Sequence, residues 1–256
     1  MNNTFDLHRF TLLLKRQWLE FGKIFLITLL VATGVLIAFY GIILLPLQTI
    51  KLIIFRLDFR QPLFFIFGFL FISIIASSYF AHLGQKSKAI VDLLIPASTF
   101  EKFLAGVFFT SIFSVLSFLL IFTITDLAFV AYIKSYFKTT ENIQELANIK
   151  TFFNKNNVNS FAPLYVMPVT VTSIFLLGSV YFKRFHYIKT AICIMIFSGA
   201  ATSIVIKVSE VLLGGKTAIN GNHGKDTMEW LLFAIIAACT LVVLSITYVR
   251  LKEKEV

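Results

Sequence analysis

Six long runs of apolar residues, separated by short polar segments, dominate the pattern along this chain of 256 residues. Each run is about 20 residues long, which is the length that a helix needs to cross the hydrocarbon core of a bilayer. A soluble fold of this size does not need six such runs, because its surface helices keep a polar face towards water. The pattern therefore predicts an all-α integral membrane protein with six transmembrane helices. They would cover approximately residues 24–44, 62–81, 103–125, 162–182, 187–206 and 230–249.

The residues before the first run have an amphipathic pattern. Their apolar side chains recur at steps of three and four, as Leu7, Phe10, Leu14, Trp18 and Phe21. This spacing is typical of a helix that lies in the membrane interface, with its aromatic side among the acyl chains. We therefore predict an interfacial helix over residues 5–21. The alternative is a cytosolic extension of the first span.

Composition changes the interpretation of the charge. The chain is 58% hydrophobic and 14% charged, and its formal net charge is +10. In a soluble protein this excess would suggest nucleic acid as a partner. Here the basic residues lie in short loops beside apolar runs, where they meet lipid phosphates, so we expect membrane lipid and no nucleic acid. The connectors are too short for a separate soluble domain of usual size, which predicts a single transmembrane domain over residues 1–256.

The distribution of lysine and arginine predicts the orientation. A cytosolic N-terminus places slightly more than half of the 23 basic residues in cytosolic segments. The clearest of these segments are the short hairpin at Lys183-Arg184 and the tail after Arg250. Six spans then place both termini in the cytosol.

The connector between the second and third runs is amphipathic. Residues 85–95 can form a short helix with Leu93 and Leu94 on one face and with Lys88 and Asp92 outside it. Such a helix would lie across the membrane surface, with its apolar face available to the membrane or to a partner.

A sharp corner follows this short helix. Pro96 ends the helix, because the residue before a proline is pushed out of the helical conformation. Ser98 and Glu101 then have the spacing of a capping box, in which each side chain accepts a hydrogen bond from the backbone N–H of the other. The sequence therefore predicts a fixed corner at the start of the third span.

The segment that contains this corner, Leu-Leu-Ile-Pro-Ala-Ser-Thr-Phe-Glu-Lys-Phe-Leu at residues 93–104, resembles the "LLLPAS…EKFL" corner of bacterial ABC-2-type transporter permeases. The plan of the chain is also similar, with an N-terminal interfacial helix, six spans and cytosolic termini. The resemblance implies a multi-pass permease subunit of the bacterial-type inner (plasma) membrane, functioning in ATP-driven export. It further implies that residues 85–95 are a coupling helix that contacts a separate ABC ATPase subunit. By position, its contact residues would be Lys88, Asp92, Leu93 and Leu94. A second copy or a related permease would complete the pathway, and the 30 phenylalanines would tolerate an amphipathic or lipid-like substrate.

Motifs for covalent chemistry are absent from the sequence. Gly214-Gly215-Lys216-Thr217 looks like the end of a phosphate-binding loop, but the first glycine of G-x-x-x-x-G-K-[ST] would fall on Glu210. The hydrolase motifs H-E-x-x-H and G-x-S-x-G do not occur, and the four histidines lie far apart in the sequence. We therefore expect no catalytic residue, metal or cofactor in this chain. ATP would be hydrolysed by the partner subunit.

Small and hydroxyl side chains cluster within the second and fifth runs, including Ser73, Ser77, Ser198 and Thr202. Such residues let helices approach closely and form hydrogen bonds across an interface. Helix packing and pathway lining are both open interpretations of these positions.

Two other classes of function compete with the permease. The first is a polytopic membrane scaffold or regulatory protein that transports nothing. The second is a secondary transporter, which usually has ionisable residues near the bilayer midplane. The apolar runs contain almost none, and Asp126 follows the third run directly. We predict a structural role for Asp126, as a cap or at a helix interface, about one turn before its helix ends.

Overall fold

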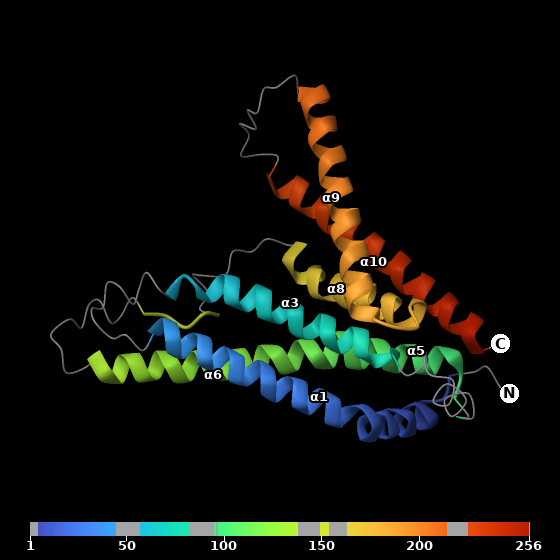
Figure 1. Ribbon diagram of the computed structural model, residues 1–256, viewed down its shortest axis with the longest axis horizontal. Coiled ribbons are helices and arrows are strands. Elements are labelled where there is room, and N and C mark those ends of the chain that lie inside the picture. The colour runs from blue at the N-terminus through green and yellow to red at the C-terminus, as the bar shows by residue number, and fades with distance from the viewer. Residues whose placement is uncertain are drawn as a thin grey trace. The chain divides into compact units, whose positions relative to one another are not determined.

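The computed structural model describes residues 5–44, 57–81, 95, 97–137, 149–153, 163–213 and 225–255. Every regular element in these ranges is helical (Figure 1). The elements are α1 (Leu7–Leu44), α3 (Arg60–Tyr79), α5 (Thr99–Val107), the π-helical η2 (Phe108–Phe113), α6 (Ser114–Phe137), α8 (Pro163–Tyr181), α9 (His186–Leu213) and α10 (Lys225–Glu255). Because α5, η2 and α6 form one continuous rod, these ranges contain six helices long and apolar enough to cross a membrane. The predicted all-α, multi-pass fold is confirmed at this level.

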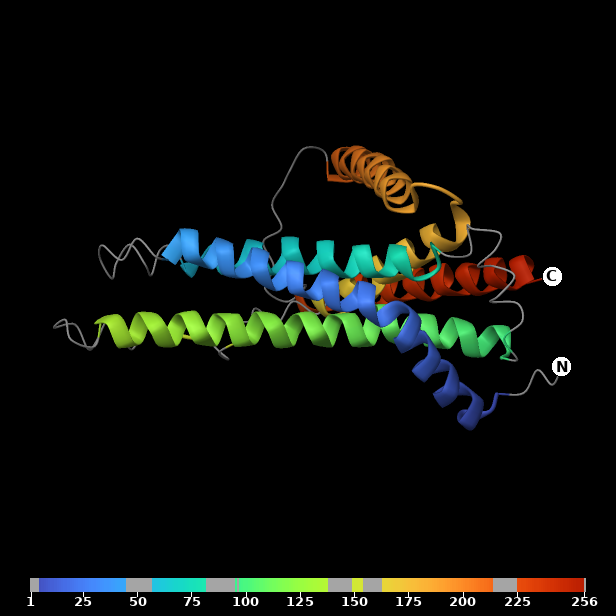
Figure 2. The same cartoon turned by 60° about the horizontal axis from the view of Figure 1, so that its bottom comes forward.

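The N-terminal segment continues directly into the first span. α1 is one continuous helix of 38 residues, so the interfacial helix expected over residues 5–21 is not seen as a separate element and stays a prediction. The physical reason is that no proline interrupts the sequence from Leu7 to Leu44. Figure 2 shows the dark-blue N-terminal part of α1 bending away from the rest of the helix. Of the expected apolar stripe, Phe21 is buried but Leu7 is 69% exposed.

The chain divides into two compact units, each built from segments distant in sequence. One unit contains Met1–Phe5, Ala76–Gly106 and Phe161–Val256, and the other contains Asp6–Ile75 and Val107–Ser160. We call them the α8–α10 unit and the α1–α6 unit. The single transmembrane domain over residues 1–256 stays a prediction.

Aromatic side chains form the core of the α1–α6 unit. The η2 segment is π-helical, and its Phe109 and Phe113 rings both lie against Trp18 of α1, at centroid distances of 6.4 and 5.4 Å. Gly68 of α3 allows a further close approach, because an added Cβ would lie 2.9 Å from the Phe118 ring of α6. Aromatic pairs contribute about 0.5–1.5 kcal/mol beyond the area that they bury.

In the α8–α10 unit, α8 and α10 lie side by side and run in the same direction. The hydroxyls of Thr170 and Thr240 are 2.8 Å apart. Further along both helices, the Arg250 guanidinium lies 5.7 Å from the centre of the Tyr181 ring. The hairpin after α8 and the C-terminal part of α10 are therefore at the same end of the unit, as the orientation requires. That this end faces the cytosol stays a prediction.

A tight hairpin joins α8 to α9. Gly178 makes it possible, because a Cβ at this position would overlap the Thr190 hydroxyl of α9. At its far end α9 is described as far as Leu213.

Candidate functional site

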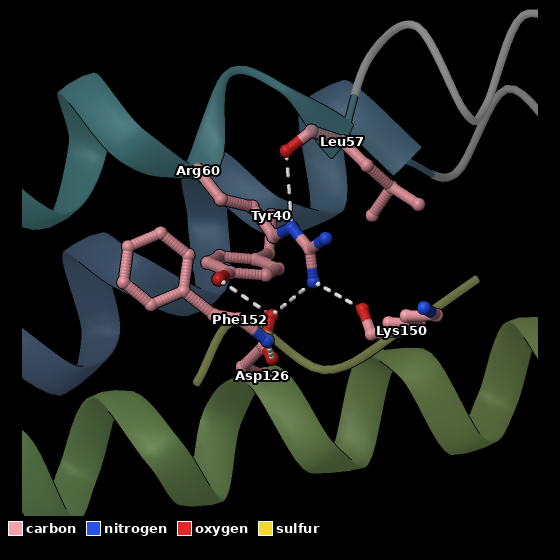
Figure 3. Close-up of polar contacts among 6 residues, drawn as sticks. All are labelled: Tyr40, Leu57, Arg60, Asp126, Lys150 and Phe152. Atoms are coloured by element: carbon pink, nitrogen blue, oxygen red, sulfur yellow. Dashed lines mark hydrogen bonds and ion pairs between the residues drawn. The ribbon is translucent and has the colours of Figure 1, made fainter. Parts of the chain in front are cut away.

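A buried polar cluster centred on Asp126 of α6 occupies the α1–α6 unit (Figure 3). Asp126 is 2% exposed. Its Oδ1 accepts hydrogen bonds from Arg60 Nη1 at 3.0 Å and from the Tyr40 hydroxyl at 3.1 Å. Its Oδ2 accepts the backbone N–H of Phe152 at 2.7 Å. Three donors from three segments of the chain therefore converge on one carboxylate.

Arg60 is the cation of this cluster, at the first position of α3. It is 8% exposed, and besides Asp126 it donates to two carbonyl oxygens, from Nε to Leu57 and from Nη1 to Lys150, both at 3.0 Å. Removing two charges from water is costly unless their remaining hydrogen-bonding groups are satisfied. These contacts partly meet that condition, because both side chains bond to further groups besides each other.

The cluster holds a short irregular segment, residues 149–153, against α3 and α6. Polar contacts hold its backbone at Lys150 and Phe152, and Ile149 is 0% exposed. The Phe152 ring lies 5.2 Å from Phe64 and 5.1 Å from Phe122. Residues 149–153 themselves form no regular helix. The aromatic contacts and the Asp126 carboxylate satisfy this segment without a helical turn.

The structure corrects the position predicted for Asp126 and agrees with its structural role at a helix interface. α6 continues to Phe137, so about three helical turns follow Asp126 rather than one. The helix continues because Val130, Ile133 and Phe137 are all buried. Arg60, its partner, lies just before the apolar run assigned to the second span, 66 positions away in the sequence, so the local pattern does not pair the two residues.

The Asp126 cluster is suited to holding elements together rather than to covalent chemistry. The carboxylate already accepts from three donors and its charge is balanced by Arg60. No group of three or more His, Cys, Asp or Glu side chains that could hold a metal ion occurs among the described residues.

The corner at the start of α5 has the predicted capping box. The Ser98 N–H donates to Glu101 Oε2 at 2.9 Å, and the Glu101 N–H donates to Ser98 Oγ at 3.2 Å. Glu101 is 0% exposed. The first turn of α5 also contacts α10, because the Phe100 and Phe103 rings lie 6.2 and 5.6 Å from Tyr248. The corner is thus fixed locally and braced against the last span.

The residues predicted for the coupling helix lie outside the part of the chain that the structure describes, which lacks residues 82–94 and 96. They are Lys88, Asp92, Leu93 and Leu94, and the adjoining Pro96 is outside it as well. The coupling helix therefore stays a prediction.

The four small hydroxyl residues are described, and they differ in burial. Ser73 and Ser77 of α3 are 3% and 4% exposed, whereas Ser198 and Thr202 of α9 are exposed. Both hydroxyls on α9 donate to backbone carbonyls of their own helix, from Ser198 to Met195 and from Thr202 to Ser198. The hydroxyl protons of these two exposed side chains are therefore satisfied within α9 itself.

Comparison with family models, with curated proteins and with solved structures found no match to this chain. Its function must accordingly be argued from its own residues.

Proposed function

We propose that this chain is the transmembrane permease subunit of an ATP-driven transporter of the ABC-2 type, which exports an amphipathic or lipid-like substrate. The observation that carries the proposal is the corner at Ser98 and Glu101. It belongs to the segment that resembles these permeases, and it begins the rod of α5, η2 and α6 while its first turn contacts α10. A push on the preceding connector would therefore reach two spans.

The energy in this proposal comes from outside the chain. A separate ABC ATPase would dock on residues 85–95, with Leu93 and Leu94 as apolar anchors and with Lys88 and Asp92 as rim charges. A second copy or a related permease would complete the pathway. The Asp126 cluster fits a supporting role, because its charges are paired with each other instead of being available to a moving ion.

Co-purification in mild detergent tests the proposal. Full-length protein should retain a nucleotide-binding chain, and the double change Leu93→Glu, Leu94→Glu should abolish this retention, since buried unpaired charges are costly. The matched control is Leu93→Met, Leu94→Met, which keeps apolar side chains of similar volume and should retain the partner.

The opposing results are equally defined. If wild-type protein retains no nucleotide-binding chain, or if the glutamate variant retains as much as the methionine variant, the permease assignment fails. A membrane scaffold then becomes the better interpretation. Proton- or sodium-dependent flux in purified vesicles would instead favour a secondary transporter.

A further inference from the structure

One end of the α8–α10 unit gathers an excess of basic side chains. It comprises the hairpin after α8, the first turn of α9 and the C-terminal end of α10 from Arg250 onward, which lie together because α8 and α10 run in the same direction. All of its basic residues are exposed, namely Lys183, Arg184, Lys189, Arg250, Lys252 and Lys254. We call this set the basic end.

Acidic side chains do not balance these charges. Among the described side chains of residues 181–189 and 250–254, Glu253 supplies the sole carboxylate, and it accepts a hydrogen bond from Arg250 Nη1 at 2.7 Å. Partial removal from water, and to a smaller extent the charge of Lys183, lowers the pKa of Lys254 below its usual range. Like charges brought together by a fold raise its energy unless an anion lies near both of them. The arrangement therefore favours a negatively charged ligand.

Aromatic side chains accompany the cations at this end. Lys189 Nζ lies 5.6 Å from the centre of the Phe182 ring, and Arg250 lies over Tyr181. Phe185, in the hairpin, has a φ of 54° and is 71% exposed. A positive φ is unusual for so bulky a residue, and here it accompanies an apolar ring exposed among charged neighbours. Aromatic and basic residues side by side are typical of the level of lipid headgroups.

We propose that the basic end binds the phosphate headgroup of an anionic phospholipid. Lys183 and Lys254 would lie on either side of the phosphate, and Phe185 would enter the boundary between headgroups and acyl chains. A soluble anion would use the same cations but would gain nothing from the exposed ring. This inference requires only that the helices lie in a membrane, so it does not depend on transport.

The test compares lipids that differ in charge. Purified full-length protein is titrated with phosphatidylglycerol or with phosphatidylcholine, and bound lipid is counted by native mass spectrometry. We expect preferential retention of phosphatidylglycerol. Each basic residue near an anionic surface contributes roughly fivefold in affinity, so Lys183→Gln with Lys254→Gln should weaken binding about 25-fold. The control is Lys134→Gln, an exposed lysine in the last turn of α6, which should leave the preference unchanged.

Two further arms decide what kind of anion binds. Phe185→Ser should weaken retention of phosphatidylglycerol, and inorganic phosphate should compete poorly with the lipid. Equal retention of both lipids by wild-type protein would overturn the proposal, and so would an unchanged preference in the double lysine variant. Full displacement by inorganic phosphate, with no effect of Phe185→Ser, would assign the site to a soluble anion instead.

Discussion

Replacing Asp126 with asparagine is the sharpest test of the buried cluster. The change keeps the size of the side chain but removes its charge. One amide oxygen can still accept from Arg60 and Tyr40, but the amide NH₂ would then face the Phe152 N–H that now donates to Oδ2. Arg60 would become a buried cation without its counter-charge, since it is only 8% exposed.

The expected loss of stability is large. Removing one partner of a buried ion pair costs about 3–5 kcal/mol, mainly because the other charge stays buried. Tyr40→Phe should cost about 1 kcal/mol, the usual value for one hydrogen bond, because the ring can keep its contact with Phe129 at 5.2 Å. In the double variant Asp126→Asn, Arg60→Gln, the loss of stability should be smaller than the sum of the two single losses, by about 0.5–3 kcal/mol for a coupled pair.

Tryptophan fluorescence during unfolding in mixed micelles can measure these losses of stability specifically in the α1–α6 unit. The chain has two tryptophans, and Trp18 lies against Phe25, Phe109 and Phe113 of the α1–α6 unit. Trp230 lies on α10 and is 64% exposed, so Trp230→Phe leaves Trp18 as the reporter. A loss below about 1 kcal/mol for Asp126→Asn, or full additivity with Arg60→Gln, would refute the argument that this pair is energetically coupled.

Three further changes test other parts of the fold. Ser98→Ala should destabilise the start of α5 by about 1 kcal/mol, the typical cost of losing an N-cap, and faster hydrogen exchange at the Glu101 amide would report it. Gly178→Ala should cost about 1–3 kcal/mol by overpacking against Thr190, and adding Thr190→Ala should restore part of the melting temperature. A single cysteine at Arg184, with Cys193 and Cys239 replaced, should react with an impermeant thiol reagent only after the cells are permeabilised; labelling in intact cells would reverse the orientation.

Structural features that are set by residues close together in the sequence could be predicted from it. The six spans follow from the length and apolarity of the runs alone. The capping box follows from the three-residue spacing of Ser98 and Glu101, and both of its hydrogen bonds are present. The interfacial segment shows the limit of such patterns. Its amphipathic stretch is real, but a stretch without a helix breaker does not show where one helix ends and the next begins.

The Asp126 cluster could not be derived in this way, because its members are distant in the sequence. Arg60 and Asp126 are separated by 66 positions, and Tyr40 lies on a third helix. A signal was nevertheless available. A carboxylate within a helix long enough to span a membrane is costly, so it requires a partner at the same depth. A search for a cation beside the neighbouring run would have found Arg60 at the start of α3.

The capping box and the Asp126 cluster lie on the same continuous rod, residues 99–137, with the π-helical turn η2 between them. Ser98→Ala and Tyr40→Phe each remove one hydrogen bond, and each should cost about 1 kcal/mol. If the chain serves only as a scaffold, the two variants should therefore behave alike. If the corner transmits force from an ATPase, Ser98→Ala should uncouple hydrolysis from transport while Tyr40→Phe leaves coupling intact. The matched free energies separate a mechanical role from a purely structural one, because any difference in coupling then comes from where the bond lies.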